Sequence, residues 1–179
     1  MAPRARKEIA APPPPAKVAG SAKARRSAAR LAAVQALYQI DLTGTSAETV
    51  VTEFVQHRIG RDDPEGDKLV TADPQLFADI VRGTMVRRAD IDQLAGGALS
   101  QQWSLERLET PLRAVLRAGT WELLCNPAVD AGIIINDYVE VAHAFFGGKE
   151  PGMVNGVLDR VARTVRQGAA GGGQGSTPP

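Results

Sequence analysis

Apolar residues recur at helical spacing along most of the chain. In the segment that begins at Ser21, the apolar positions Leu31, Val34 and Tyr38 follow one another every three or four residues, which places them on one face of a helix. The segment is also rich in alanine, the best helix former, and Gly44 is a typical helix stop. No run of β-branched and aromatic residues alternates with period two, and aromatics make up only 4% of the chain. We therefore predict an all-α fold.

Capping residues and prolines divide the chain into helices. Asp73-Pro74 and Thr110-Pro111 each combine a helix-capping residue with a proline, which is favoured in the first helical turn, and Asn126-Pro127 ends a helix. Polar loops are expected at 60–72 and 147–152. We expect six main helices and one short turn: residues 21–44, a helix capped by Thr45 or Ser46, 74–96, the turn at 103–108, 110–126, 132–146 and a last helix with Val154, Val157, Val161 and Val165 facing inward.

The two ends of the chain differ in composition from its middle. Residues 1–22 form a basic, proline-rich arm, and residues 168–179 form a glycine-rich tail. Neither stretch has enough apolar surface to offset the entropy of ordering it. We predict that both are disordered, around one helical domain at 23–167.

The charge of the chain is unevenly distributed. Residues 1–30 hold eight Lys or Arg and one acidic residue, whereas the rest holds 13 basic and 19 acidic residues. A basic arm on a mildly acidic body indicates a polyanionic partner or, equally, a solubilising tail. No apolar run is long enough to span a bilayer, no secretory signal is evident, and the lone Cys125 excludes an intramolecular disulfide. We predict a cytoplasmic protein without a membrane partner.

Signals for an enzyme are weak. His57 and His143 stand alone, without Cys or carboxylates at metal-ligand spacing. Gly147-Gly148-Lys149 lacks the leading glycine and the following Ser or Thr of a phosphate-binding loop. We expect no catalytic site, no metal and no cofactor.

The start of the first helix carries the strongest binding signal. Arg25, Arg26 and Arg30 lie within six residues, and positions 26 and 30 share a helix face. Guanidinium groups suit phosphates because they are planar and always charged. The opposite face of this helix is apolar and must dock, which would hold the basic end in a fixed place.

Four segments together resemble the NusB family. They are ARRSAARLAAVQALYQIDLTG (residues 24–44), RLETPLRAVLRAGTWELL (107–124), IINDYVEVAHAFFG (134–147) and MVNGVLDRVAR (153–163). They occur in the family's order over most of the predicted domain. The chain departs from the family pattern at Trp121, where Tyr is usual, and at Asn136 to Tyr138, which replaces Asn-Glu-Ala.

The resemblance implies a fold of two three-helix bundles packed together and no enzymatic activity. It implies binding of the single-stranded boxA element of nascent ribosomal RNA, jointly with the ribosomal protein NusE. The complex acts on RNA polymerase, which then passes terminators. Whether the chain forms a homodimer is left open.

The resemblance also implies the site. The RNA-binding residues are Arg25, Arg26, Arg30, Arg117, Lys149, Met153 and Asn155, and the NusE-facing residues are Tyr38 and Leu112, although both could be core. Met153 replaces a family Phe, which would weaken base stacking there. Asn155 suits a base edge or a 2′-hydroxyl or, equally, an intrahelical role. We expect the arginines near residue 25 and the tip near residue 150 to converge on one cationic cleft.

Three alternatives remain. The chain could be a helical protein-interaction module that works without RNA. It could be the leading domain of an RNA cytosine methyltransferase, but it lacks the second domain and its catalytic cysteines. Helix-turn-helix DNA binding is weaker still, because no short turn precedes a polar recognition helix.

Overall fold

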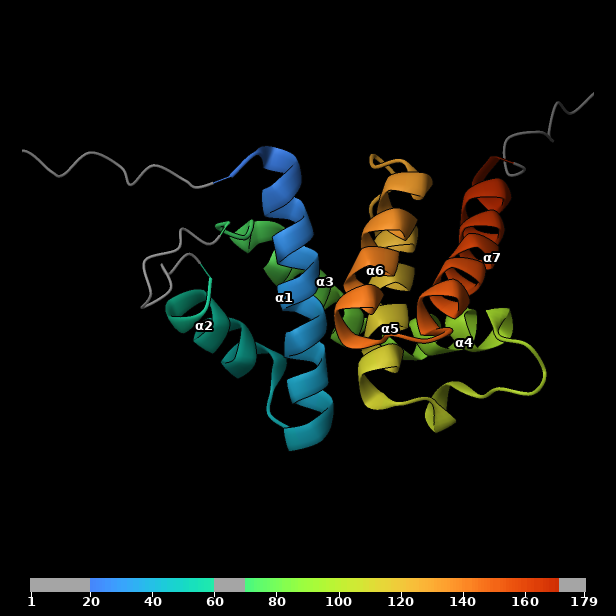
Figure 1. Ribbon diagram of the computed structural model, residues 1–179, viewed down its shortest axis with the longest axis horizontal. Helices are drawn as coiled ribbons and strands as arrows, with labels where there is room; N and C mark the ends of the chain where they lie inside the picture. Colours follow the sequence, from blue (N-terminus) through green and yellow to red (C-terminus); the bar gives the residue numbers. More distant parts are fainter. Residues whose placement is uncertain (1–19, 60–69, 171–179) are drawn as a thin grey trace, which may run out of the picture.

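The computed structural model describes residues 20–59 and 70–170 (Figure 1). Within these ranges the chain forms seven α-helices and one short 3₁₀ helix, and no strand. The helices are α1 (Ala22–Thr43), α2 (Ala47–His57), α3 (Pro74–Val86), α4 (Arg88–Ala98), η1 (Leu105–Arg107), α5 (Thr110–Cys125), α6 (Ala131–Phe145) and α7 (Glu150–Ala170).

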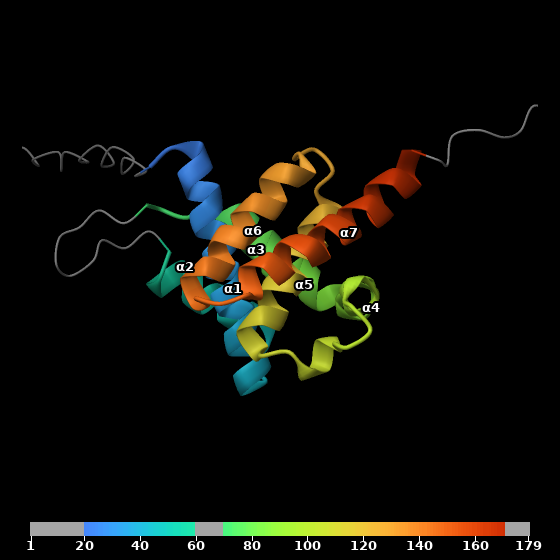
Figure 2. The ribbon, with the colours of Figure 1, turned by 45° about the vertical axis from the view of Figure 1, so that its right-hand side comes forward.

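The helices pack as two bundles of three. Helices α1, α2 and α3 all contact one another, and so do α5, α6 and α7. Helix α1 joins the bundles by packing on both α5 and α6, while α4 lies against α5 and α7 (Figures 1 and 2). The predicted fold of two packed three-helix bundles is confirmed.

Several helices begin at capping residues that can be recognised in the sequence. The Ser21 hydroxyl accepts a hydrogen bond from the Ala24 N–H, and Ser46 accepts one from Thr49 in the same way. The Asp73 carboxylate accepts from two amides at the start of α3. These side chains satisfy amides that have no partner inside the helix. At the end of α1, Gly44 has φ +67°, a left-handed conformation that glycine adopts without strain.

Three predicted boundaries are wrong. The helix expected over 74–96 breaks at Arg87 (φ −104°, ψ 23°), because α3 packs on α1 whereas α4 turns toward α7. The last helix begins at Glu150 rather than near Val154, since Pro151 is tolerated in a first helical turn. It also runs to Ala170, so residues 168–170 are helical rather than part of a tail. Residues 1–19, 60–69 and 171–179 of the predicted arm, loop and tail lie outside the described residues.

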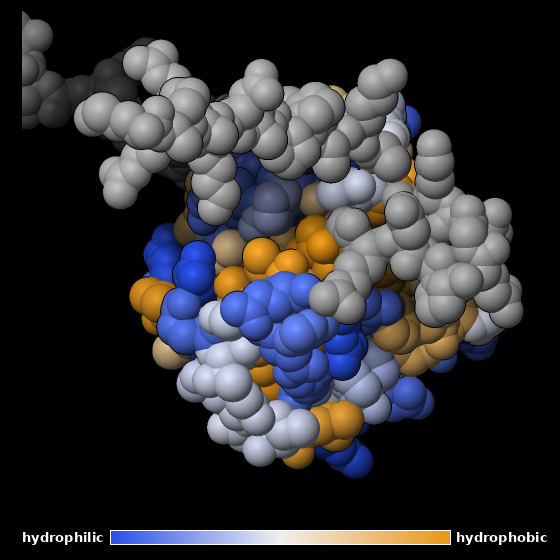
Figure 3. All heavy atoms as spheres, turned by 90° about the vertical axis from the view of Figure 1, so that its left-hand side faces the viewer, coloured by the Kyte–Doolittle hydropathy of each residue, from blue (hydrophilic) through white to orange (hydrophobic). Residues whose placement is uncertain are grey.

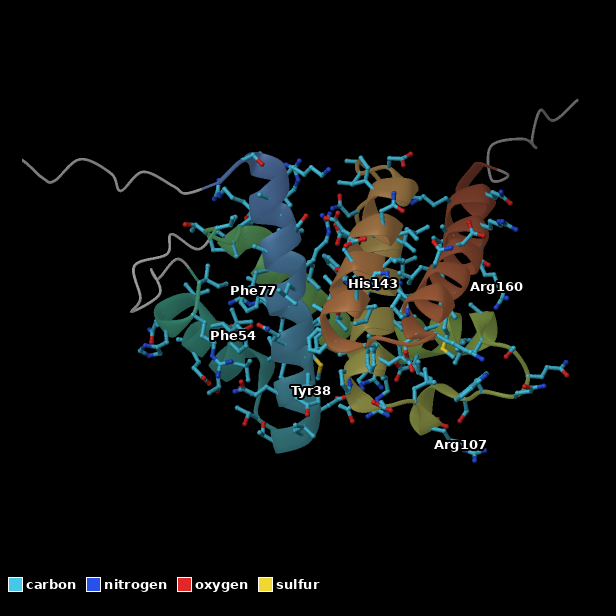
Figure 4. The ribbon with its side chains drawn as sticks, in the orientation of Figure 1. Tyr38, Phe54, Phe77, Arg107, His143 and Arg160 are labelled. Atoms are coloured by element: carbon cyan, nitrogen blue, oxygen red, sulfur yellow. The ribbon has the colours of Figure 1, made fainter. Side chains whose placement is uncertain are left out.

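Close contacts between helices fix the core. The rings of Phe54 and Phe77 stack at 5.5 Å between centroids and join α2 to α3 (Figure 4). Gly83 on α3 leaves room for the indole of Trp121 on α5, and a Cβ at Gly83 would lie 2.1 Å from the indole nitrogen. Small residues at such crossings let the helices approach closely.

The surface is mixed in character. The side formed by α1 and α2 is largely hydrophilic, with patches of hydrophobic atoms between the polar ones (Figure 3).

In the part of the chain that the structure describes, no helix is both long enough and apolar enough to cross a bilayer.

Candidate nucleic-acid interface

Arg30 lies in the interior, at the junction of the two bundles. Its Nε donates to Glu122 on α5 at 2.9 Å, and its other nitrogens donate to Glu122 and to Asp137 on α6. The hydroxyl of Tyr138 donates at 3.0 Å to Glu122 Oε2, the oxygen that also accepts from Arg30 Nε. Arg30 is 1% exposed and Glu122 is fully buried. This cluster ties α1 to α5 and α6.

The pKa values of Arg30 and Tyr138 are shifted in this buried cluster. Burial by itself lowers the pKa of the Arg30 guanidinium, but the hydrogen bond and charge of Glu122 outweigh it and raise the pKa above its ordinary value. Burial, and then the negative charge of Glu122, raise the pKa of Tyr138 well above its ordinary value. Arg30 is therefore a permanently paired cation. The prediction that Arg30 belongs to an exposed basic patch is wrong, because α5 and α6 cover the part of the helix face where Arg30 lies.

Arg117 also takes part in an internal network of ion pairs. It makes a two-pronged contact with Asp92 on α4, at 2.7 and 2.9 Å, and donates to Asp41 on α1 at 2.8 Å. Asp41 also pairs with Arg88 and Arg113. Arg117 is 7% exposed. The structure therefore places this predicted RNA contact in a cluster that joins α1, α4 and α5, away from the solvent.

Other cations have no carboxylate at ion-pairing distance among the described residues. These are Lys23, Arg25, Arg26, Arg107, Lys149, Arg160 and Arg166. Three of them occupy the first turns of α1, which supports two of the predicted arginines, Arg25 and Arg26, as available charges. Arg26 is exposed and Arg25 is half-buried. Among the described residues, the cations without a carboxylate partner thus lie at the start of α1, at the α6–α7 loop, at η1 and along α7, where Arg160 and Arg166 donate to backbone carbonyls instead.

A groove of about 500 Å³ runs between α1 and α6. Lys23, Ala28 and Leu31 line its α1 side, and Asp137 and Glu140 line its α6 side. Arg25, Arg26 and Lys149 do not line it. The start of α1 lies at one end of the molecule, and the α6–α7 loop lies beside the opposite half of α1, on the same broad side (Figures 1 and 2). The two predicted regions share a side of the molecule, but a partly acidic groove separates them, so the single cationic cleft expected from the sequence is not formed.

The start of α7 presents its predicted residues in different directions. Lys149 is exposed, and its carbonyl accepts the Met153 N–H at 3.1 Å. Met153 is half-buried against α4 and the connection that follows it. Asn155 is exposed and two positions further on, about 200° around the helix. Met153 and Asn155 therefore cannot contact the same nucleotide face.

The two predicted partner residues also separate. Leu112 is 4% exposed and belongs to the core, so it does not offer a docking surface. Tyr38 is half-buried on α1 (Figure 4). Leu42, one turn further along α1, is 60% exposed. The spacing of Leu42 from Tyr38 would place it on the buried face of the helix, but α1 extends at that end beyond the helices that cover the rest of it (Figure 1).

The comparisons with known proteins agree with this architecture. The model of the NusB family matches residues 27–163. The chain belongs to the NusB family. A Rhizobium rhizogenes protein named transcription antitermination protein NusB is 48% identical over 152 residues, which is 85% of this chain and 92% of that protein.

Two solved structures share the NusB fold. The Thermotoga maritima NusB structure has a TM-score of 0.63 and 28% identity, and the match covers 77% of this chain and 90% of that chain. A complex described as antitermination factors NusB and NusE with double-stranded RNA has a TM-score of 0.65 and 23% identity, over 80% of this chain and 99% of that one. The second match supports the fold alone.

The relatives of this chain are named transcription antitermination proteins. Among the described residues, no group of three or more His, Cys, Asp or Glu could hold a metal ion.

The sequence analysis did not assign Lys23, Arg107, Arg160 or Trp103 to a site. For the three cations the sequence gives no signal, because arginines that form ion pairs in this chain look the same in the sequence as those that do not. Only the positions of the carboxylates separate the two groups.

Proposed function

We propose that this NusB-family chain is a transcription antitermination factor that binds the single-stranded boxA element of nascent ribosomal RNA together with the ribosomal protein NusE. The family match over residues 27–163 carries the proposal. The relatives named transcription antitermination protein NusB support the role, and the two proposed partners are of the kinds described for a NusB of the same fold, which was solved with NusE and double-stranded RNA. In this account the bound complex acts on RNA polymerase and lets it pass terminators.

The RNA surface is proposed on the side shared by the start of α1 and the α6–α7 loop. Arg25 and Arg26 supply charges that lack a carboxylate partner among the described residues, and Lys149 supplies another at the loop. The first turn of α7 adds amides that favour a phosphate. Asn155, exposed on α7, remains the proposed contact for a base edge or a 2′-hydroxyl.

The NusE surface is proposed at the far end of α1. Tyr38 is half-buried there and Leu42 is exposed on the same helix face, one turn away. A partner that covers Leu42 would remove an exposed apolar side chain from water. Replacing Leu42 by Ser should weaken NusE binding without lowering the stability of the chain alone.

Fluorescence anisotropy tests the proposal. A labelled boxA oligonucleotide is titrated with the protein, with and without NusE, against a scrambled strand and a boxA duplex. We expect micromolar or weaker affinity for the protein alone, tighter binding with NusE, and a steep fall with salt because each phosphate contact releases counterions. Equal binding to all three RNAs at every salt concentration would contradict sequence-specific recognition of a single strand.

A charge reversal separates this function from a protein-interaction module. Arg25→Glu with Arg26→Glu should abolish antitermination if RNA is bound and should spare it if the module acts through proteins alone. Sedimentation of the free protein should accompany the test, because a homodimer that covers the start of α1 would compete with RNA.

A further inference from the structure

A small hollow lies between the first turns of α7 and the connection from α4 to η1. Its volume is about 170 Å³, and we call it the Trp103 hollow. Trp103 forms one side, Met153 and the glycines of α7 form another, and Arg160 lies at its edge. Arg160, a residue of α7, is labelled in Figure 4.

The backbone at Trp103 is held in place although the residue is 49% exposed. The backbone N–H of Trp103 donates to the Ser100 carbonyl at 2.9 Å in a tight turn, and the nearby Leu105 and Leu108 are buried in the core. The backbone that carries the indole is thus anchored on both sides. An ordered backbone that presents a large aromatic face to solvent loses little entropy when a flat ligand stacks on that face.

The wall opposite Trp103 is open because two of its residues are glycines. A Cβ added at Gly152 or Gly156 would meet no atom within 4 Å. Met153 lies between them, and its thioether is a soft surface against which a planar ring can pack. The hollow therefore has one aromatic side and one shallow, adaptable side.

The charge around the hollow favours an anionic chain. Arg160 donates to the Ala98 carbonyl at 2.6 Å and has no carboxylate partner among the described residues. No Asp or Glu lines the hollow. By contrast, Asp137 and Glu140 line the α1–α6 groove, and Asp90 lines the groove between α4 and α7. Of these three depressions, only the Trp103 hollow combines an aromatic face with positive charge and no negative charge.

We propose that one base of the bound RNA strand leaves the stack of its neighbours and packs on Trp103 in this hollow, with Arg160 facing the adjacent phosphate. The inference rests on the proposed function, and it extends the RNA surface beyond the α6–α7 loop. Lys149 directly precedes α7, and Met153 in the first turn of α7 lines the hollow, so Lys149 and the hollow lie at the same end of α7. The indole supplies the aromatic face that Met153 lacks.

Two substitutions, Trp103→Ala and Gly156→Leu, test the proposal, one on each side of the hollow. The first removes the stacking face and the second fills the space. Each should weaken binding of a labelled single-stranded boxA oligonucleotide about tenfold, since stacking contributes roughly 1–3 kcal/mol per base. The salt dependence should stay unchanged, because stacking releases no counterions. Val86→Ala, at an 85% exposed residue of α3 outside the hollow, is the matched control and should bind as the wild type does.

Tryptophan fluorescence gives a second readout. RNA should quench the wild-type emission, and Trp103→Ala should lose that quenching, because the other tryptophan, Trp121, is packed against α3. Trp103→Phe should restore most of the affinity. Wild-type affinity in both Trp103→Ala and Gly156→Leu, without quenching in the wild type, would overturn the inference and leave the proposed function intact. Absence of any RNA binding by the wild type, even with NusE, would overturn both.

Discussion

Arg30 on α1 and Glu122 on α5 form a buried ion pair across 92 positions of sequence. Asp137 contacts the same guanidinium and Tyr138 contacts the same carboxylate, so three helices meet at one charged cluster. The pair lies where α1 joins the second bundle. One arginine of an apparently uniform basic run therefore holds the fold together, while its neighbours on the first turn stay available to a ligand.

Replacing Arg30 by Met should destabilise the protein strongly. The change leaves the buried carboxyl of Glu122 without its main partner, and removal of one member of a buried pair reduces the free energy of unfolding by about 3–5 kcal/mol. Urea unfolding followed by circular dichroism measures the loss. Arg26→Met is the matched control, since Arg26 is exposed, and its effect should stay within about 0.5 kcal/mol. Similar stabilities for the two variants would show that the cluster does not hold α1.

Neutralising Arg26 should change RNA binding instead of stability. Arg26→Gln removes a charge that has no carboxylate partner among the described residues. Loss of one phosphate contact should reduce the slope of log affinity against log salt by about one. Anisotropy at several salt concentrations measures the slope. Arg163→Gln serves as the control, because Arg163 is paired with Asp159 on the exposed side of α7; an equal change in both variants would argue against a specific contact at α1.

Adding a methyl group at Gly83 should loosen the contact between α3 and α5. Its Cβ would lie 2.1 Å from the Trp121 indole nitrogen, so the ring or a helix must shift. We expect Gly83→Ala to lower the free energy of unfolding by about 1–3 kcal/mol. Gly156→Ala, with open space around it, should be neutral or stabilising by about 0.4–1 kcal/mol. Thermal unfolding of both variants measures the difference, and a stable Gly83→Ala would contradict the tight crossing.

Alkaline pH should destabilise the protein through Tyr138. Burial, and then the charge of Glu122, raise the pKa of Tyr138 well above its ordinary value. Because the folded-state pKa exceeds the unfolded one, the neutral phenol contributes stability that is fully present below the unfolded pKa, near pH 10. That stability is lost as the pH rises through the folded pKa.

Urea unfolding over this alkaline range, for the wild type and Tyr138→Phe, isolates the contribution of Tyr138. The wild type should lose stability more steeply with pH than the variant does. Parallel curves would mean that the phenol ionises as easily in the folded state as in the unfolded one.

Local signals in the sequence were sufficient for most helix boundaries. Ser21, Asp73 and Gly44 act at the ends of helices through contacts within a few residues, and such contacts are visible in the chain itself. The break at Arg87 has no comparable signal. It follows from the different partners of α3 and α4, which come from elsewhere in the chain.

The sequence by itself determined the all-α class, the order of the helices and the family, because these depend on periodicity, on capping residues and on segments that resemble the family, all of which are present in the linear chain. Only the tertiary structure decided which cations can meet a ligand. Arg26 and Arg30 are four residues apart and share a helix face, yet α5 and α6 cover one of them and leave the other exposed. Exposure and ion pairing depend on groups brought together by folding, and the spacing of residues along one helix does not contain that information.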